Sequence, residues 1–184
     1  AEIFPARVIN VVNGRGDTVG SPLINHAGVR MISVTGSIAT GQKVIQAAQA
    51  TLKRTHLELG GKAPVIVFDD AEVASGGEGL RTFGYYNAGQ DCTAACRIYA
   101  GTKVHDKLVA DLSSAVRSIK MGTQDEPDVE IGPLISQRQR ERVAGFVERA
   151  KGVSHMQVTA GGSVGRSWAG GRGTTGLSTS STRP

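Results

Sequence analysis

The stretch "YYNAGQDCTAAC" contains both cysteines of the chain. A cysteine thiolate is a strong nucleophile, and the small residues that follow Cys92 in a predicted turn leave room for a substrate carbonyl. Asn87 and the backbone amides of this turn can donate hydrogen bonds to an oxyanion. The alternative is that Cys92 is a small buried apolar residue, as free cysteines commonly are. Cys96 has no comparable surroundings, and we expect it in the core.

A carboxylate in an apolar strand is the second candidate. In "LELGGKAP", Glu58 lies between two leucines and just before a double glycine. Burying a charged carboxylate is costly, so a carboxyl group in such a place binds protons more readily, as a general base requires. The alternative is a glutamate at the edge of a strand whose carboxylate reaches water. The pattern alone leaves both interpretations open.

Two glycine-rich turns can bind phosphate groups. "NGRGDTVG" places Gly16 and Gly20 between a predicted strand and a predicted helix, in a spacing one residue away from the dinucleotide-binding fingerprint. "TGSIATGQK" lacks the Gly-Lys-Ser/Thr run of a P-loop. Its residues Gly36, Ser37 and Gly41 nevertheless lie at the beginning of a predicted helix, whose N-terminal amides attract anions. For Ser37 the alternative is a simple helix N-cap.

Strands and helices alternate along the chain, so the sequence predicts an α/β fold with a parallel sheet. Short apolar runs predict strands, and longer amphipathic stretches predict helices. The predicted strands are 8–12, 29–36, two within 55–68 and 97–100, and we expect Val65–Phe68 to be a core strand. The predicted helices are one that begins in "GRGDTVG", 38–49, one capped by Asp69 and Asp70 that ends near Asn87, 105–120 and 137–150.

The composition is ordinary for a soluble globular protein and disfavours several other classes. The 184 residues are 39% hydrophobic and 20% charged, with a net charge of +5. Lys and Arg are scattered and aromatic residues make up only 4%, so we expect no nucleic-acid partner. No apolar run reaches the ~18–20 residues of a membrane span, so we expect no membrane partner. Two cysteines form no disulfide framework and no zinc-spaced cluster, which predicts a cytoplasmic protein without a metal.

Together these segments resemble the aldehyde dehydrogenase superfamily. "LELGGKAP" is similar to its glutamate signature and "YNAGQDCTAAC" to its cysteine signature, and Glu58 and Cys92 lie 34 positions apart, as in the family. The segments "FPARVINVVNGRGDTVG", "ISVTGSIATG" and "IGPLIS" also occur in the family's order. The resemblance covers about Phe4 to Gly162.

The resemblance implies an activity and a role for each candidate residue. Cys92 would attack an aldehyde to give a thiohemiacetal, hydride would pass to NAD(P)+, and the resulting thioester would be hydrolysed with Glu58 as general base. We expect NAD+ rather than NADP+. The residues implied at the cofactor are Gly36, Ser37, Gly41 and Leu59, with Gly16 and Gly20 near its adenosine. At the oxyanion the resemblance implies the Cys92 backbone N–H, while the asparagine with which the family completes the oxyanion hole is missing from this sequence. The turn itself offers Asn87 as a donor to the oxyanion and Asp91 as a residue at the substrate.

The resemblance also implies a domain organisation. Residues 1–58 would be the C-terminal part of a Rossmann-like cofactor domain, and 59–162 the beginning of the catalytic domain, with helices flanking a parallel sheet. The tail 163–184 is rich in Gly, Ser and Thr, and we expect it to be disordered or shifted in reading frame from about Arg172. Family enzymes are longer, so we expect a truncated internal fragment. An inactive remnant and a cofactor-independent thiol esterase are the alternatives.

The identity of the substrate is the most specific expectation that the resemblance implies. "FGYYNAGQDCTAACRIYA" is most similar to the bacterial γ-aminobutyraldehyde branch, which implies an ω-amino aldehyde such as 4-aminobutanal. The phenylacetaldehyde and betaine aldehyde branches are alternatives. Asp91 beside the nucleophile can attract a cationic substrate, or it can simply face solvent. Full-length relatives are expected to be homo-oligomers.

Overall fold

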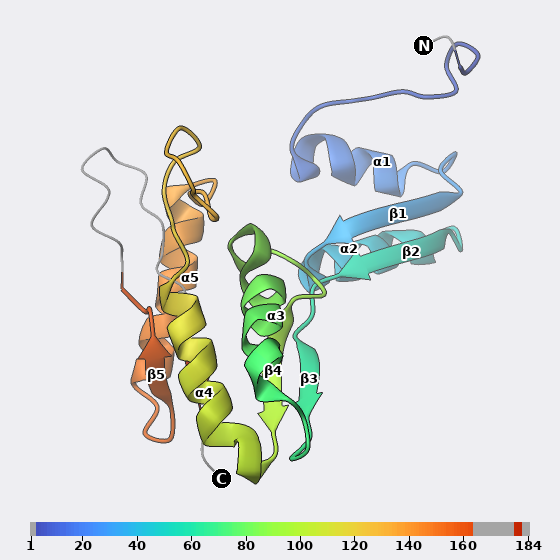
Figure 1. Ribbon diagram of the computed structural model, residues 1–184. Coiled ribbons are helices and arrows are strands. Elements are labelled where there is room, and N and C mark those ends of the chain that lie inside the picture. The colour runs from blue at the N-terminus through green and yellow to red at the C-terminus, as the bar shows by residue number, and fades with distance from the viewer. Residues whose placement is uncertain (1–2, 164–178, 182–184) are drawn as a thin grey trace. The chain divides into compact units, whose positions relative to one another are not determined.

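The computed structural model describes residues 3–163 and 179–181 (Figure 1). The chain folds as two units, Ala1–Gly60 and Gly61–Pro184, and each has hydrophobic clusters of its own. The border between the units lies next to the expected domain border after residue 58. The assignment of cofactor binding to one part and catalysis to the other stays a prediction. Each unit contains a parallel strand pair with flanking helices, so the predicted α/β class is confirmed.

The first unit is built around a parallel β–α–β arrangement. Strands β1 (Met31–Gly36) and β2 (Arg54–Leu59) pair in parallel, and helix α2 (Ile38–Gln49) connects them. A π-helical turn, η1 (Gly16–Gly20), and helix α1 (Ser21–Asn25) precede β1. Successive side chains of a strand point to opposite sides, so one side of the pair faces α2. The cluster on that side consists of Ile32, Val44 and Ala48, surrounded by Ile24, Val29, Val34 and Leu57.

Helix α2 begins where the sequence predicts. Ser37 Oγ accepts a hydrogen bond from the backbone N–H of Thr40 at 3.1 Å, so Ser37 is the N-cap. Its side chain satisfies one of the amides that the first helical turn leaves without an intrahelical partner. The interpretation of Ser37 as an N-cap is therefore confirmed, and its additional role at a phosphate stays a prediction.

The predicted strand at 8–12 is wrong. These residues form no strand, and the apolar side chains among them are exposed, from 54% at Val8 to 81% at Val11. A strand needs a neighbour to complete its backbone hydrogen bonds. None of the strands in the described part of the chain pairs with this segment. The apolar run at 8–12 therefore has the propensity for a strand but lacks a neighbouring strand in the described part of the chain.

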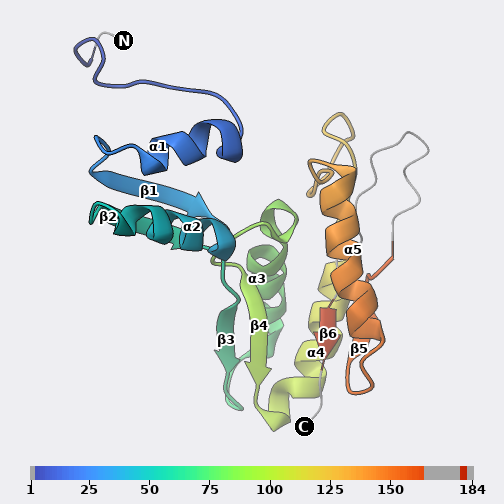
Figure 2. The same cartoon turned by 180° about the vertical axis from the view of Figure 1, so that it is seen from behind.

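The second unit repeats the parallel arrangement. Strands β3 (Ala63–Val67) and β4 (Ala95–Ala100) pair in parallel, and helix α3 (Val73–Tyr85) lies between them in sequence. Helix α4 (Thr102–Arg117) follows β4 and lies beside α3 in both views (Figures 1 and 2). Both helices pack on the same face of the strand pair. The cluster there consists of Val73, Val104 and Leu108, surrounded by Val67, Leu80, Ile98 and Ala100.

The last described elements extend the second unit. Helix α5 (Gln137–Lys151) begins after Ser136, whose Oγ accepts a hydrogen bond from the backbone N–H of Gln139, so the predicted helix is confirmed. Strand β5 (Gln157–Ala160) pairs in antiparallel orientation with β6 (Thr179–Ser181). Strand β6 falls inside the segment 163–184 for which we expected disorder. The rest of that segment beyond residue 163, including the expected frameshift, lies outside the described residues.

Strand β3 is not the fully buried core strand that its apolar sequence suggests. Ile66 is 65% exposed and Phe68, just after the strand, is 70% exposed. Ile66 lies opposite Tyr99 of β4, which is 51% exposed, so the two strands share one exposed face. Val67 instead packs toward α3 and α4. A continuous apolar run is compatible with burial on both faces, but it does not show which faces are covered.

Asp69 caps α4 and not α3, contrary to expectation. Its Oδ1 accepts a hydrogen bond from the backbone N–H of Lys103 at 3.0 Å, in the first turn of α4. Helix α3 begins after Glu72 without a side-chain cap. The parallel register places the carboxyl ends of β3 and β4 side by side, so a residue just after β3 reaches the helix that follows β4.

Gly101, the N-cap of α4, lets Asp69 come close. A Cβ at Gly101 would lie 2.1 Å from Asp69 Oδ1 and 3.2 Å from the Asp69 backbone nitrogen. Gly101→Ala is therefore expected to displace Asp69, to disrupt the cap and to lower the free energy of unfolding by about 1–3 kcal/mol. Urea unfolding followed by far-UV circular dichroism measures the loss.

Gly79→Ala is the matched control for this variant. Gly79 lies inside α3, and no atom lies within 4 Å of a Cβ placed there. Alanine is favoured over glycine in a helix interior by about 1 kcal/mol, so this variant should unfold at the same or a higher urea concentration. Equal midpoints for Gly101→Ala and the unchanged chain would show that the cap tolerates a methyl group.

Candidate active site

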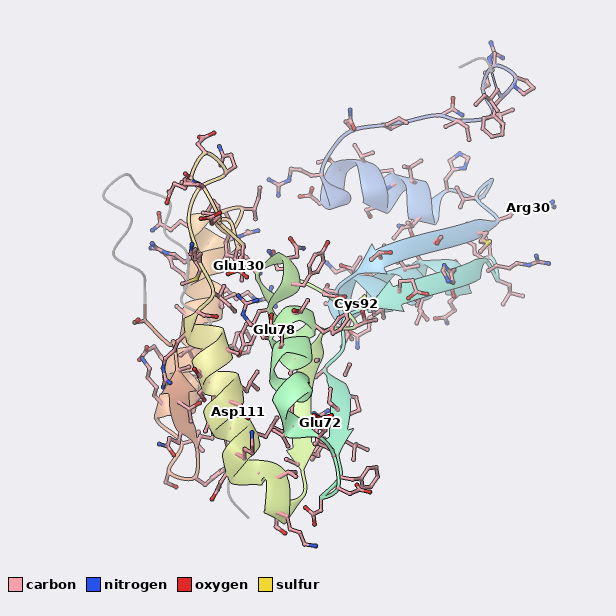
Figure 3. All side chains as sticks on the ribbon, in the orientation of Figure 1. Arg30, Glu72, Glu78, Cys92, Asp111 and Glu130 are labelled. Atoms are coloured by element: carbon pink, nitrogen blue, oxygen red, sulfur yellow. The ribbon has the colours of Figure 1, made fainter. Side chains whose placement is uncertain are left out.

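Cys92 lies in the turn that leads into β4, and its position is labelled in Figure 3. The residue is exposed, so the alternative of a small buried apolar residue is wrong for this cysteine. Gly61, which begins the second unit, lies close to this turn, because a Cβ there would be 3.6 Å from the Cys92 carbonyl oxygen. The thiol is therefore accessible and is carried by a turn between regular elements.

Asp91 holds the turn in place. Its Oδ1 accepts hydrogen bonds from the backbone N–H and from the hydroxyl of Thr93, each at 2.9 Å. These hydrogen bonds, together with one from the Cys92 thiol, lower the pKa of Asp91 below its ordinary value. Ala94, the next residue, is buried and anchors the turn from the other end. The Asp91 carboxylate thus has a structural role at the nucleophile, and its proposed attraction for a cationic substrate stays a prediction.

Cys96 is exposed, so its expected place in the core is wrong. The reason is an irregularity in the strand pair. Ala63 lies opposite Ala95, but the next residue of β3, Pro64, lies opposite Arg97. Cys96 is therefore the extra residue of a bulge, which interrupts the alternation that would bury it.

The loop before Cys92 has an unusual backbone. Asn87, Ala88 and Gly89 have φ angles of 50°, 58° and 73°, in the left-handed region that favours glycine. Two side-chain hydrogen bonds brace it. Asn87 Nδ2 donates to the Gln90 carbonyl and Gln90 Nε2 donates to the Asn87 carbonyl, both at 3.1 Å. The Asn87 amide carries two N–H groups, and its role as an oxyanion donor stays a prediction.

This loop borders a cavity of about 320 Å³. The opposite wall is the segment that contains "IGPLIS", and Glu130 at its beginning forms an ion pair with Arg81 of α3. Hydrogen bonds from the Lys120 backbone N–H and from Arg81 lower the pKa of Glu130. The ion pair ties this segment to α3. The cavity is lined by Tyr86, Asn87, Ala88, Gln90, Glu130, Ile131, Gly132 and Pro133.

Helix α3, which leads to this loop, ends in a partly buried phenol. Tyr85 packs against a cluster that includes Leu112 and Val116, and burial raises its pKa to about 12. Tyrosine in an unfolded chain ionises near pH ~10. Between about pH 10 and 12 the unfolded chain binds fewer protons than the folded chain, so stability present below pH ~10 is lost as the pH rises. Tyr85→Phe is expected to flatten this alkaline loss, which urea unfolding at about pH 9 and pH 11 measures.

The expected size of this effect is about 1 kcal/mol per pH unit. Tyr86→Phe is the matched control, because Tyr86 is 68% exposed and follows directly in sequence. It should leave the alkaline loss unchanged. If Tyr85→Phe loses stability above pH ~10 as steeply as the unchanged chain, another group is responsible.

Glu58 lies on β2 in the first unit and is not buried. Its side chain is 61% exposed, while Leu57 on the adjacent position packs toward α2. The two leucines beside Glu58 do not surround it, because neighbouring residues of a strand point to opposite faces. Of the two interpretations that the sequence left open, burial of Glu58 is therefore wrong, and the alternative of a carboxylate that reaches water is confirmed. Its role as a general base stays a prediction.

His56 is a residue near Glu58 that the sequence patterns did not single out. Its Nε2 lies 3.1 Å from Glu58 Oε1, and its Nδ1 lies 3.0 Å from Ser33 Oγ on β1. The signal that could have found it is the spacing of two residues from Glu58, which places both side chains on one face of a strand. The proximity of Ser33 to His56 follows from the register of β1 and β2, and no local sequence pattern predicts that register.

The glycines predicted at the cofactor have different surroundings. Gly41 is buried in α2, where a Cβ would lie 2.7 Å from Leu59 Cδ1, so it allows close packing of α2 on β2. Gly36 ends β1 directly before the N-cap of α2. Gly16 and Gly20 bound the exposed turn η1, with open space at both Cβ positions. These features explain local packing and chain direction, and a role of the four glycines at a cofactor stays a prediction.

Comparison with known proteins identifies the family. The family model "Aldehyde dehydrogenase family" matches residues 1–174. The chain is 39% identical to a betaine aldehyde dehydrogenase of Mesorhizobium japonicum over 152 residues, which cover 80% of this chain and 31% of that protein. The chain belongs to the aldehyde dehydrogenase family, whose members are NAD(P)-dependent oxidoreductases. It spans about a third of the length of the curated relatives that it matches.

Solved structures agree with this assignment. Lactaldehyde dehydrogenase from Escherichia coli superposes with a TM-score of 0.86 at 33% identity, over 94% of this chain and 36% of that one. Betaine aldehyde dehydrogenase from Staphylococcus aureus, solved in complex with NAD+, has a TM-score of 0.76 at 35% identity, over 81% of this chain and 29% of that one. Within the described residues, no helix is long and apolar enough to cross a membrane.

Proposed function

We propose that this chain carries the reacting residues of an aldehyde dehydrogenase, with Cys92 as nucleophile and Glu58 as general base. The observation that carries the proposal is the exposed Cys92 thiol in a braced turn of a chain from this family. The Cys92 thiolate adds to the carbonyl carbon of the aldehyde, and Asn87 and the Cys92 backbone N–H stabilise the resulting oxyanion. Bound NAD+ supplies the acceptor for the hydride. Glu58 then takes a proton from the water that hydrolyses the Cys92 thioester.

The beginning of α2 is suited to a cofactor phosphate. Strand β1 ends at Gly36 and α2 begins after Ser37, so the first amides of the helix lie at the carboxyl end of a parallel strand. Dinucleotides bind at such ends, where helix amides meet the pyrophosphate. Similarity to the Staphylococcus aureus protein, whose structure contains NAD+, supports NAD+ as the cofactor. Gly41 and Leu59 fix the packing of the helix there, and Gly16 and Gly20 would lie near the adenosine.

We propose a cationic aldehyde as the substrate. The cysteine motif favours 4-aminobutanal, and the similarity to a betaine aldehyde dehydrogenase favours an aldehyde with a quaternary ammonium group. Both carry a positive charge at neutral pH. The similarity to lactaldehyde dehydrogenase supports an uncharged substrate as the competing candidate.

The test is formation of reduced cofactor by the purified chain. It is incubated with 4-aminobutanal, betaine aldehyde, phenylacetaldehyde or lactaldehyde, each with NAD+ and with NADP+. The expected result is reduced NAD+ and carboxylic acid in equal amounts, formed fastest from the two cationic aldehydes. Cys96→Ala is the matched control, since it removes the other exposed thiol and should react like the unchanged chain.

A parallel assay with p-nitrophenyl acetate and no cofactor separates the alternatives. Hydrolysis of the ester without any aldehyde oxidation would favour the thiol esterase. Silence in both assays would favour the inactive remnant. Equal rates for all four aldehydes would overturn the cationic substrate and leave the dehydrogenase in place.

A further inference from the structure

The segment 8–12 has the side chains of a strand without a neighbouring strand. Its four apolar side chains are all exposed. The Val8 backbone N–H donates to the Pro5 carbonyl at 3.2 Å, which closes the turn before the segment. From residue 9 to residue 12, no backbone N–H or C=O group forms a hydrogen bond within the described part of the chain. The segment therefore offers both apolar side chains and free backbone groups.

Strand β1 offers a matching edge in the same unit. Its sheet consists of β1 and β2 alone, so the side of β1 away from β2 pairs with no strand among the described residues. A free edge presents N–H and C=O groups to any added strand, and charged side chains on an edge strand oppose such pairing. The exposed side chains of β2 include Arg54, His56 and Glu58, whereas those of β1 carry no charge. The edge of β1 is therefore the less protected of the two.

The alternation of the segment fits this edge. In an extended strand, Ile9 and Val11 point to one side, and Asn10, between two valines, points to the other. Strand β1 has a corresponding division, because Ile32 faces the hydrophobic cluster under α2 and Ser33 lies on the opposite face. An added strand in this orientation places Ile9 and Val11 beside the apolar side of β1. Asn10 then lies on the polar side with Ser33.

We infer that residues 8–12 of one chain add as a strand to the β1 edge of a second copy of this chain. Within one chain the segment runs clear of the β1–β2 pair (Figures 1 and 2). Each copy has one such segment and one such edge, so two copies that exchange segments form two equivalent contacts. Main-chain hydrogen bonds supply the attraction, as in other cases of strand addition. The contact does not involve Cys92 or Glu58, so it is independent of the proposed function.

The dimer is expected to be weak, because a five-residue strand buries less surface than the ~800 Å² per partner of a stable interface. Sedimentation equilibrium between about 1 and 300 µM covers the corresponding range of dissociation constants. The average mass should rise from that of one chain toward that of two. Val11→Lys introduces a charge on the apolar side of the added strand. It should raise the dissociation constant between about 10- and 100-fold, as expected from the loss of a buried valine.

Two matched variants separate strand addition from general adhesion of apolar side chains. Leu52 is 91% exposed and lies in the same unit, outside both the segment and β1. Leu52→Lys makes the same kind of change as Val11→Lys and should leave the dissociation constant unchanged. Ile66→Lys alters the exposed face of β3 and β4, which is the competing apolar surface, and should also leave it unchanged. Far-UV circular dichroism shows whether each variant keeps its fold.

Amide hydrogen exchange locates the contact. When the concentration rises through the dissociation constant, exchange should slow by about 10-fold or more in residues 9–12 and in β1, with no change in β4. One chain mass at every concentration would overturn the inference. Weaker association in Ile66→Lys, with none of this effect in Val11→Lys, would assign the contact to β3 and β4 and overturn it as well. So would slow exchange in residues 9–12 that is independent of concentration, because the segment would then pair within its own chain.

Discussion

Replacing Cys92 by alanine is expected to abolish covalent capture of an acyl group by this chain. Cys92 and Cys96 are its only thiols, and both are exposed, but only Cys92 lies in a turn braced by a neighbouring carboxylate. Without the sulfur no thiohemiacetal or thioester forms, so oxidation of aldehyde should fall roughly 10³-fold or more. Mass spectrometry after brief exposure to p-nitrophenyl acetate should find the acetyl group on Cys92 of the unchanged chain and none on the variant.

Cys96→Ala separates this effect from general thiol chemistry. Cys96 lies only four residues away and is similarly open to solvent, so a non-selective reagent would modify both. We expect Cys96→Ala to retain the initial burst of p-nitrophenolate, which reports acylation of Cys92 by p-nitrophenyl acetate, and to retain the acetyl adduct. An adduct that persists in Cys92→Ala and disappears in Cys96→Ala would assign the nucleophile to the wrong cysteine.

Glu58→Gln is expected to have the second largest effect, and on a different step. The amide keeps the size of the side chain, but it cannot take a proton from water. Loss of a general base typically lowers a rate by about 10²–10⁴-fold. The steady rate of p-nitrophenyl acetate hydrolysis should therefore fall by about that factor, while the initial burst of p-nitrophenolate remains. The Cys92 thioester should therefore accumulate, and the intact mass of the chain measures it directly.

Glu72→Gln serves as the control for the removal of a negative charge. Glu72 precedes α3 and makes no side-chain cap, so its neutralisation should leave both phases unchanged. A falling burst in Glu58→Gln, with the ratio of the two phases preserved, would falsify the assignment to hydrolysis and place Glu58 in activation of the thiol.

Regular elements with local signals were predictable from the sequence. The helix at 38–49 follows a serine whose side chain caps it, and the helix at 137 follows another such serine. The motifs around Cys92 and Glu58 identified the family, because each motif is long and the two lie at a fixed separation in the sequence. These features depend on neighbours a few positions apart, so the sequence contains them directly.

Features that depend on the register of strands were not predictable. The exposure of Cys96 follows from a bulge opposite Pro64, and the cap of α4 comes from Asp69 across the sheet. His56 meets Ser33 only because the two strands align in one register out of several. For the same reason the sequence could not decide between a buried and an exposed Glu58, since flanking leucines describe the composition of a strand and not the face on which a residue lies.

The backbone just before the nucleophile has a consequence for how this chain can vary. Ala88 occupies a left-handed conformation at φ 58°, between Asn87 and Gly89, which adopt it with less strain. Mutation to glycine at this position would relax a conformation that costs an L-amino acid about 1 kcal/mol, whereas a β-branched residue would raise that cost. Related sequences should therefore tolerate glycine at this position and should rarely contain valine, isoleucine or threonine there.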